Sequence, residues 1–206
     1  MLIFDLDGTL WETTKTTYEA TNMVADMYEE VNHVSMNTVI KGMGLSKYEN
    51  AKNYFPNLPE EKALKYLKER SNINMELIKK NKAYLYDGMI DTIKDLSKKY
   101  KLAIVTNSSD DYAKTFIDVS GLNDYFTDYL GAATYGITKA EAIKKIVEKY
   151  NEPDSFYIGD IKKDMDSAIE AGIRFIHARY GFEKDVDSKY YINDIRELAG
   201  VLDEIK

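Results

Sequence analysis

Asp5-Leu6-Asp7-Gly8-Thr9-Leu10 follows a short apolar run, Met1–Phe4, and this stretch decides the fold. If the apolar run is a strand, Asp5 and Asp7 point to the same face, because side chains alternate along a strand. Two carboxylates about 6 Å apart repel each other by about 3 kcal/mol at an effective dielectric of 20. A hard cation, which takes oxygen ligands, would offset that repulsion. A plain Asp-Gly turn at the end of a strand is the alternative interpretation.

The composition is that of a globular protein with a net negative charge. The chain has 206 residues, of which 44% are hydrophobic and 31% charged, and this fits one domain or a core domain with an insertion. The formal net charge of −7 disfavours nucleic acid as a partner, since phosphate contacts need a basic surface. The absence of cysteine excludes thiol chemistry and fits a reducing compartment. With no membrane-span pattern and no signal-peptide pattern, we expect a cytoplasmic protein without a membrane partner.

Apolar runs rich in β-forming residues alternate with helical patterns along most of the chain. This alternation predicts βαβ units and an α/β fold with a doubly wound parallel sheet. A continuous apolar run such as Leu102–Val105 is typical of a strand that is covered on both faces. The predicted strands are Leu2–Leu6, Leu102–Thr106, Tyr129–Ala133, Ser155–Gly159 and Arg174–Ala178.

Two helices of this region have predictable ends. Thr138 and Glu141 have the spacing of a capping box, so a helix should begin there. Ser108 is the predicted N-cap of a helix that runs to Ser120, with Gly121 as the residue that ends it.

Residues 12–85 hold helical patterns and no convincing strand. A helical segment of about 70 residues that follows the first strand predicts an inserted cap domain at 12–85, with a core domain at 1–11 and 86–206. The predicted helices of the insertion are Thr13–Val31, Met36–Lys41, Tyr48–Tyr54, Pro59–Arg70 and Asn74–Tyr84.

The candidate site residues follow predicted strands, at the carboxyl ends where ligands bind in open parallel sheets. They are Asp5 and Asp7 after the first strand, Thr106 and Asn107 after the second, and Asp160 and Asp164 after the fourth. Gly159 would let a ligand approach the backbone beside Asp160. For Asp164, an ordinary helix-start carboxylate stays an open alternative.

Lys139 would stand in the first turn of a helix, where a cation opposes the helix dipole. Such a lysine suggests an anion to neutralise, although a solvated lysine is the open alternative. The two histidines, His33 and His177, are interpreted as structural, and the chain shows no Ser-His pairing typical of a hydrolase triad.

Four of these features, in this order, resemble the motifs of the haloacid dehalogenase (HAD) superfamily. Asp5–Leu10 resembles its DxDGT motif, and Thr106 resembles the Thr or Ser of its second motif. Lys139 resembles the lysine of motif III, and Gly159-Asp160 with Asp164 resembles the acidic GDxxxD motif. The insertion resembles the C1 cap of the phosphoglycolate-phosphatase-like branch. The resemblance implies a Rossmann-like core domain with an all-helical cap.

The resemblance also implies roles for individual residues. Asp5 would be the nucleophile that forms an aspartyl-phosphate, and Asp7 the general acid and base. Mg²⁺ would bind Asp5, the carbonyl oxygen of Asp7, Asp160 and Asp164. The implied phosphate-binding residues are Gly8, Thr9, Thr106, Asn107 and Lys139. In the cap, Lys41, Gly42, Gly44 and Lys47 are candidates for a substrate-facing loop, with a solvated helix end as the open alternative.

Asp7 separates the branches of the superfamily. Dehalogenases and phosphonatases lack an acid at this position, although Met43–Lys47 resembles the phosphonatase cap segment. Sugar-phosphate mutases often carry a histidine soon after the first motif, where this chain has Thr16 and Thr17. A non-catalytic binding module of this fold is a further alternative. We therefore expect a Mg²⁺-dependent phosphatase for a small phosphorylated metabolite, as a monomer or weak homodimer.

Two details depart from the commonest pattern of the family. Trp11-Glu12 stands where a small apolar residue and Asp are frequent, and Lys139 lacks a following proline. Neither change removes a group that the chemistry needs.

Overall fold

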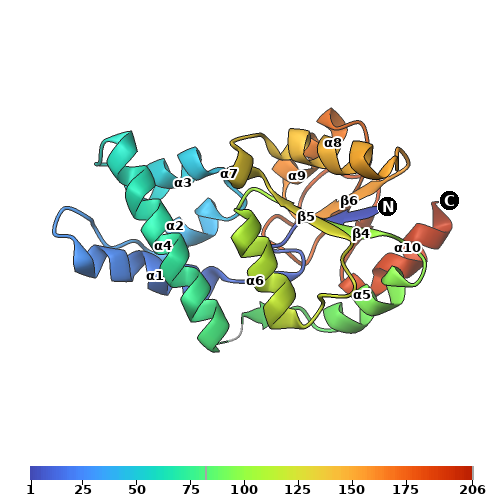
Figure 1. Ribbon diagram of the computed structural model, residues 1–206, viewed down its shortest axis with the longest axis horizontal. Helices are drawn as coiled ribbons and strands as arrows, with labels where there is room; N and C mark the ends of the chain where they lie inside the picture. The colour runs from blue at the N-terminus through green and yellow to red at the C-terminus, as the bar shows by residue number, and fades with distance from the viewer. Residues whose placement is uncertain (82, 206) are drawn as a thin grey trace. The chain divides into compact units, whose positions relative to one another are not determined.

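The computed structural model describes residues 1–81 and 83–205. The chain divides into two compact units (Figure 1). Unit 1 consists of Met1–Glu12 and Leu85–Lys206, and unit 2 of Thr13–Tyr84. Within the described ranges, none of the helices combines the length and the apolar character that crossing a membrane requires.

Unit 1 is built on a six-stranded sheet with the strand order β5-β4-β1-β6-β7-β8. All the strand pairs are parallel, and β1 lies in the middle with Leu2 opposite both Leu102 and Phe156. The strands are β1 (Leu2–Phe4), β4 (Leu102–Thr106), β5 (Asp128–Gly131), β6 (Phe156–Gly159), β7 (Arg174–Ala178) and β8 (Tyr191–Ile192). Two short strands, β2 (Trp11–Glu12) and β3 (Tyr84–Leu85), form a separate two-stranded sheet.

Helices cover both faces of the six-stranded sheet. Figure 1 shows α8 and α9 on one side and α5 and α10 on the other. The helical segments of unit 1 are α5 (Met89–Ser97), α6 (Asp110–Ser120), α7 (Ala132–Tyr135), α8 (Lys139–Tyr150), α9 (Lys162–Glu170), the 3₁₀ turn Ile195–Glu197 and α10 (Leu198–Glu204). The prediction of a doubly wound, Rossmann-like α/β fold is confirmed.

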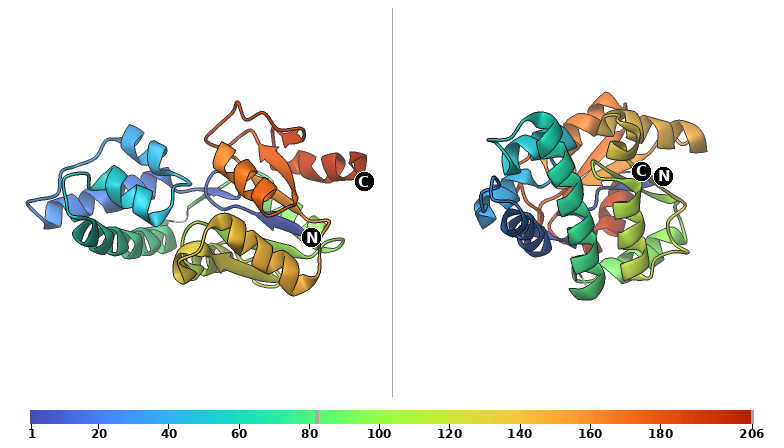
Figure 2. Two further views of the ribbon diagram at one scale, coloured as in Figure 1. Left: turned by 90° about the horizontal axis from the view of Figure 1, so that it is seen from above. Right: turned by 60° about the vertical axis from the view of Figure 1, so that its left-hand side comes forward.

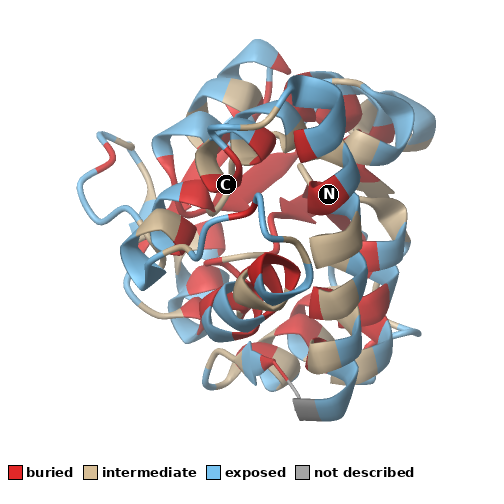
Figure 3. Ribbon diagram, turned by 90° about the vertical axis from the view of Figure 1, so that its left-hand side faces the viewer, coloured by how far each residue is buried: buried red, intermediate tan, exposed pale blue. Residues whose placement is uncertain are grey.

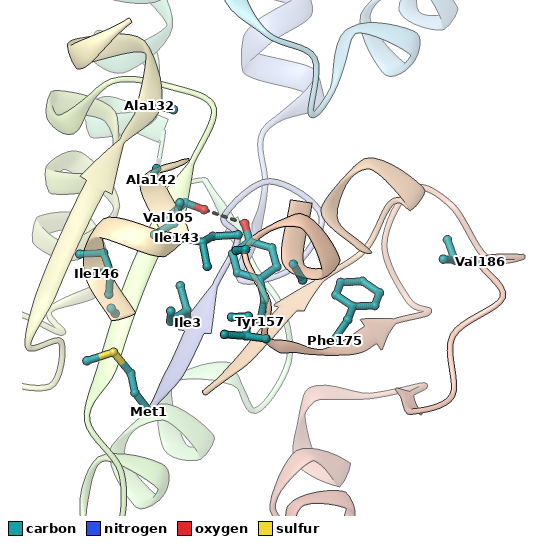
Figure 4. Close-up of a cluster of buried hydrophobic side chains, with 14 residues drawn as sticks. Met1, Ile3, Val105, Ala132, Ala142, Ile143, Ile146, Tyr157, Phe175 and Val186 are labelled. Carbon is teal, nitrogen blue, oxygen red and sulfur yellow. Dashed lines mark hydrogen bonds between the residues drawn. The ribbon is translucent and has the colours of Figure 1, made fainter. Parts of the chain in front are cut away.

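The central strands β1, β4 and β6 are fully buried, and Figure 3 shows buried strands in red and exposed outer faces of helices in pale blue. Figure 4 shows the core under α8 and α9, where Ile3 and Tyr157 of the sheet meet Ile143 and Ile146. Phe4 points to the opposite face and lies edge-on against Phe126, 6.4 Å between ring centres. This burial explains why the strand sequences are almost continuously apolar.

The two predicted helix starts differ in outcome. The capping box at the start of α8 is confirmed, because the Thr138 hydroxyl accepts from the Glu141 N–H at 3.1 Å and the Glu141 carboxylate accepts from the Thr138 N–H at 2.8 Å. Ser108 as the N-cap of α6 was wrong by one residue. Ser109 caps the helix, because the Ser108 N–H is bonded to the Thr106 hydroxyl at 3.1 Å and so belongs to the preceding turn.

Unit 2 is helical, with α1 and α4 side by side (Figure 2). Its helices are α1 (Thr14–Met27), α2 (Met36–Gly42), α3 (Lys47–Tyr54) and α4 (Glu60–Asn81). The prediction of two helices, Pro59–Arg70 and Asn74–Tyr84, was wrong, since α4 is continuous through residues 71–73, which contain no Gly or Pro. Within the second predicted range, Lys82 lies outside the described residues and Tyr84 begins β3.

Candidate active site

Three buried carboxylates meet at the carboxyl end of the sheet. Asp5 follows β1, Asp160 follows β6, and Asp164 stands in the first turn of α9. One oxygen atom from each lies within 4.8 Å of the others. Asp5 is 3% exposed, and Asp160 and Asp164 are fully buried. The parallel strand order explains the meeting, because β1 and β6 are neighbours and end at the same edge.

The ammonium group of Lys139 lies between two of these carboxylates. Its Nζ is 2.9 Å from Asp5 Oδ1 and 2.6 Å from Asp164 Oδ1, and Lys139 itself is 5% exposed. Burial lowers the pKa of Lys139, but the charges of Asp164 and Asp5 outweigh this and hold it above its ordinary value. The lysine is therefore charged, and the alternative of a solvated lysine is excluded.

The carboxylates outnumber the cations in this cluster. Burial raises the pKa of Asp5 from 3.8 to about 7; Asp164 and Asp7 add to the rise, and Lys139 opposes it. Burial, with the charges of Asp164 and Asp5, also raises the pKa of Asp160 well above its usual range. Three carboxylates face one ammonium group here, and ionisation of all three would leave two negative charges uncompensated. An oxygen donor set with this charge fits a divalent cation such as Mg²⁺.

Asp160 is oriented by donors from three segments of unit 1. The Thr9 hydroxyl donates to its Oδ1 at 3.2 Å, and the Phe182 N–H donates to its Oδ2 at 2.8 Å. His177 is buried, and its Nε2 lies 3.2 Å from the Asp160 carbonyl oxygen and 2.8 Å from that of Glu183. His177 is thus structural, as predicted, and it ties the loop that holds Phe182 to Asp160.

Asp164 combines two functions that the sequence left as alternatives. Its Oδ2 accepts from the N–H groups of Asp160 and Ile161, at 3.1 and 3.2 Å, so it satisfies free donors at the start of α9. Its Oδ1 pairs with Lys139. The space beside Gly159 that was predicted to admit a ligand is filled by Asp164, because a Cβ on Gly159 would lie 2.6 Å from the Cβ of Asp164.

Gly8 and Thr9 shape the turn that follows Asp7. Gly8 has φ +87°, and a Cβ there would lie 2.2 Å from Asp160 Oδ2, so glycine is required for both conformation and space. The N–H groups of Gly8 and Thr9 are bonded to the carbonyl oxygens of Trp11 and Leu6, at 2.9 and 3.1 Å. These bonds give Gly8 and Thr9 a structural role in the turn. Binding of a phosphate by Gly8 and Thr9 stays a prediction.

Asp7 stands two residues after Asp5 and is half-buried. Its Oδ1 accepts a hydrogen bond of 2.8 Å from the hydroxyl of Tyr112 in α6. The carboxylate is thereby held by a neutral donor and stays outside the buried Asp5, Asp160 and Asp164 cluster. Asp7 was expected to reach the metal through its carbonyl oxygen, and that stays a prediction.

The remaining predicted residues lie in two places. Thr106 is the last residue of β4, 3% exposed, and Asn107 follows it half-buried, so both lie at the carboxyl edge of the sheet. Lys47 belongs to unit 2, where its Nζ lies 5.0 Å from the centre of the Tyr48 ring. Binding of a substrate by Lys47 stays a prediction.

Tyr157, Tyr112 and the loop around Phe182 contact the site and were not predicted. The Tyr157 hydroxyl donates to the Val105 carbonyl oxygen at 2.7 Å and lies 3.5 Å from Asp5 Oδ1, and burial raises its pKa well above the usual value (Figure 4). A tyrosine between Phe156 and Ile158 in a fully buried strand was the one indication in the sequence. The Nζ of Lys139 lies 5.7 Å from the centre of the Tyr157 ring, so Tyr157 lies beside both Asp5 and Lys139.

Comparison with known proteins identifies the family. Residues 2–178 match the family model of haloacid dehalogenase-like hydrolases. A phosphoglycolate phosphatase of Aquifex aeolicus (strain VF5) is 26% identical over 201 residues, which cover 89% of this chain and 86% of that protein. A phosphoglycolate phosphatase of Aliivibrio fischeri (strain ATCC 700601 / ES114) is 24% identical over 207 residues, which cover 88% and 85%.

The fold has close counterparts among solved structures. The crystal structure of a predicted phosphoglycolate phosphatase from Haemophilus somnus 129PT superposes with a TM-score of 0.85 at 20% identity, over 98% of this chain and 97% of that one. At this identity the likeness concerns the fold alone. The match to the family model covers most of the chain, and the curated relatives share one branch. The chain therefore belongs to the haloacid dehalogenase-like hydrolase family, in its phosphoglycolate-phosphatase-like branch, and the predictions of family, fold and a phosphatase-like enzyme are confirmed.

Proposed function

We propose that this protein is a Mg²⁺-dependent phosphatase that hydrolyses a small phosphate monoester through an aspartyl-phosphate on Asp5. The observation that carries the proposal is the buried cluster of Asp5, Asp160 and Asp164 around Lys139. Phosphoryl transfer needs mainly positioning and neutralisation of charge. This cluster supplies both, at the sheet edge where the fold binds ligands.

Asp5, Asp160, Asp164 and the carbonyl oxygen of Asp7 are the groups that would hold Mg²⁺. Mg²⁺ in such a site neutralises charge on the phosphoryl oxygens and lowers the pKa values of the carboxylates that bind it. The excess of carboxyl groups over ammonium groups in the cluster, and the raised pKa values of Asp5 and Asp160 that result from it and from burial, support this assignment. Thr9 and Phe182 position Asp160 for the ion through their hydrogen bonds to its two carboxylate oxygens.

In the first step a carboxylate oxygen of Asp5 attacks phosphorus, and the bond from phosphorus to the ester oxygen breaks. Asp7 gives a proton to the leaving oxygen. In the second step Asp7 takes a proton from a water molecule, whose oxygen attacks phosphorus and releases Asp5. Tyr112 orients the Asp7 carboxylate through the 2.8 Å bond, and Lys139 opposes the rise in the pKa of Asp5 and so favours its ionised, nucleophilic form.

Thr106, Asn107 and Lys139 are the proposed ligands of the phosphoryl oxygens, with Gly8 and Thr9 at the adjoining turn. Thr106 ends β4, the strand beside β1, and Asn107 follows it. Lys139 carries a positive charge that is shared between Asp5 and Asp164, so it can contact a phosphoryl oxygen without leaving Asp5.

Unit 2 is the proposed cap, and its proposed substrate-facing segment is the junction of α2 and α3, with Lys41, Gly42, Gly44 and Lys47. Closure of such a cap excludes water from the reaction. A cytoplasmic location and a monomeric or weakly dimeric state belong to the same proposal. The substrate named by the curated relatives, phosphoglycolate, is the first candidate to assay.

Release of inorganic phosphate, with Mg²⁺ and with EDTA, tests the proposal. The substrates are p-nitrophenyl phosphate, phosphoglycolate, sugar phosphates, nucleotides and phosphonoacetaldehyde. We expect turnover of phosphate esters that requires Mg²⁺ and is abolished by Asp5→Asn. Asp166→Asn is the matched control, since Asp166 is an exposed carboxylate of α9 paired with Lys162. Hydrolysis of phosphonoacetaldehyde alone, conversion of sugar phosphates without phosphate release, or no turnover at all would each refute it.

Asp7→Asn tests the acid role separately. Loss of a general acid should slow substrates with poor leaving groups far more than p-nitrophenyl phosphate, whose leaving group needs no proton. An equal loss on both kinds of substrate would contradict the role of Asp7.

A further inference from the structure

The segment Tyr180–Glu183 of unit 1 lies directly beside the carboxylate cluster. It follows the end of β7, where the Gly181 N–H donates to the Ala178 carbonyl oxygen at 3.1 Å and turns the chain. A Cβ on Gly181 would lie 2.3 Å from the Cβ of Asp160 and 2.5 Å from the carbonyl oxygen of Gly8. The backbone of this segment is therefore packed against a proposed metal ligand and against the turn at Gly8.

The segment reaches both carboxylate oxygens of Asp160. The Phe182 N–H donates directly to Oδ2 at 2.8 Å. Tyr180 reaches Oδ1 through one intermediate residue, because its hydroxyl donates to the Thr9 carbonyl oxygen at 2.8 Å and the Thr9 hydroxyl donates to Oδ1 at 3.2 Å. The orientation of Asp160 thus depends on one direct bond and on a second bond that passes through Thr9.

The backbone bonds of the turn that carries Thr9 join residues of the turn itself. The N–H groups of Gly8 and Thr9 donate to carbonyl oxygens three residues away. Such bonds set the shape of the turn but not its place beside Asp160, which is 151 residues from Thr9 in the sequence. The Tyr180 hydroxyl comes from 171 residues away and ties the turn to the segment that also holds Asp160. Thr9, Asp160 and the segment therefore form a closed ring of contacts.

Tyr180 is itself held in place, and the segment is held at its other end. The Tyr180 ring lies edge-on to the Tyr86 ring, with 4.8 Å between the ring centres. Burial raises the pKa of Tyr180 well above its ordinary value, so the hydroxyl keeps its proton for the bond to Thr9. The Glu183 carboxylate accepts from the Lys162 N–H at the start of α9, at 2.7 Å. The segment is thus a fixed support for Asp160.

We propose that Tyr180 is a positioning residue of the metal site, which holds Asp160 through Thr9 and thereby raises the affinity for Mg²⁺. The carboxylate oxygens of Asp5, Asp160 and Asp164 lie within 4.8 Å of one another, and like charges at this distance repel. Groups that fix the orientation of a carboxylate lower the cost of gathering such ligands around an ion. The proposal rests on the Mg²⁺ binding of the proposed function and adds to it a residue that acts through Thr9.

Calorimetric titration of the substrate-free protein with Mg²⁺ near pH 8 tests the proposal without any turnover. Tyr180→Phe removes the hydroxyl and keeps the ring that packs on Tyr86. We expect this variant to raise the Kd for Mg²⁺ about 3- to 10-fold, the usual effect of losing one neutral hydrogen bond. Tyr191→Phe is the matched control, because Tyr191 is 42% exposed on β8 and its hydroxyl should not affect the Kd.

Thr9→Val tests whether Tyr180 acts through Thr9. This substitution removes the hydroxyl that contacts Asp160 and keeps the carbonyl oxygen that Tyr180 contacts. Thr9→Val should raise the Kd at least as much as Tyr180→Phe does. The double variant should bind Mg²⁺ like Thr9→Val alone, because Tyr180 then has no Thr9 hydroxyl to position. Effects of the two substitutions that simply add would overturn the connection through Thr9.

Turnover of p-nitrophenyl phosphate gives a second readout that a merely structural role would not produce. Tyr180→Phe should need more Mg²⁺ for its half-maximal rate, recover its kcat at saturating Mg²⁺ and keep the KM for the ester within about twofold. A kcat that stays low at saturating Mg²⁺ would overturn the proposal.

The proposal and the proposed function fail in different ways. An unchanged Kd in a Tyr180→Phe variant, beside a wild type that binds Mg²⁺ and turns over, overturns the role of Tyr180 and leaves the phosphatase in place. A wild type that neither binds Mg²⁺ nor hydrolyses p-nitrophenyl phosphate overturns the proposed function, and the role of Tyr180 with it.

Discussion

Removing the charge of Lys139 should destabilise the metal-free protein strongly. Lys139→Met keeps most of the side-chain volume and deletes the ammonium group that lies 2.9 Å from Asp5 and 2.6 Å from Asp164. At an effective dielectric of 20, each contact has a Coulomb energy of about 6 kcal/mol. Much of this offsets the cost of burying the charges, so the measured loss should be about 3–5 kcal/mol, typical of a broken buried ion pair.

Urea unfolding in EDTA near pH 8, followed by tryptophan fluorescence, measures this loss. Trp11 is the one tryptophan of the chain, is fully buried and lies 5.1 Å from the rings of both Tyr112 and Phe116, so it reports on unit 1. Lys149→Met is the matched control at the other end of α8. Lys149 is exposed, and its ion pair with the half-buried Asp128 should contribute only about 0–1 kcal/mol. If the two variants differ by less than about 1 kcal/mol, the reasoning about the buried cluster is refuted.

Three further predictions concern the candidate active site. Gly8→Ala should weaken Mg²⁺ binding at least about tenfold, because a Cβ would displace Asp160. Gly136→Ala is the control: Gly136 has a similar φ of +66°, a Cβ there would have nothing within 4 Å, and Mg²⁺ binding should be unchanged. Calorimetric titration with Mg²⁺ measures both variants, and equal effects would show that backbone strain alone is responsible. Tyr112→Phe should lower kcat about 3- to 10-fold on poor leaving groups with little change in KM, because Asp7 loses its orienting bond; an unchanged kcat would contradict this. Burial raises the pKa of Asp5 from 3.8 to about 7, so between pH 3.8 and about 7 the folded metal-free protein binds more protons than the unfolded chain. The free energy of unfolding of the metal-free protein should therefore fall as the pH rises through this range. The Tm gain from Mg²⁺ should accordingly be larger near pH 8 than near pH 5, and an equal gain at both would argue against metal binding by these carboxylates.

The sheet and the carboxylates at its edge could be predicted because residues close together in the sequence indicate them. The continuous apolar runs reveal strands buried on both faces, and the residues that follow parallel strands must share one edge. Asp5, Asp160 and Asp164 therefore could be placed together before any contact was known. The capping box of Thr138 and Glu141 was equally local, since both of its bonds lie within four residues.

Other features depend on contacts between distant parts of the chain. Tyr112 reaches Asp7 across 105 residues, and Phe182 reaches Asp160 across 22. Just after the predicted break in α4, Asn74 is buried and bonds to Thr17 of α1, 57 residues away. Local propensity at residues 71–73 is weak, so tertiary packing decides whether the helix continues.

The most direct test of the central claim is to trap the phosphorylated enzyme. Wild-type protein is mixed with Mg²⁺ and a turned-over phosphate monoester, quenched in acid within milliseconds, digested and analysed by mass spectrometry. We predict one phosphoryl group on the N-terminal peptide that contains Asp5, labile to hydroxylamine as an acyl phosphate is, and absent from Asp5→Asn. Phosphate release without any phosphorylated peptide, a phosphoryl group on another residue, or continued turnover by Asp5→Asn would contradict the assignment of Asp5 as the nucleophile.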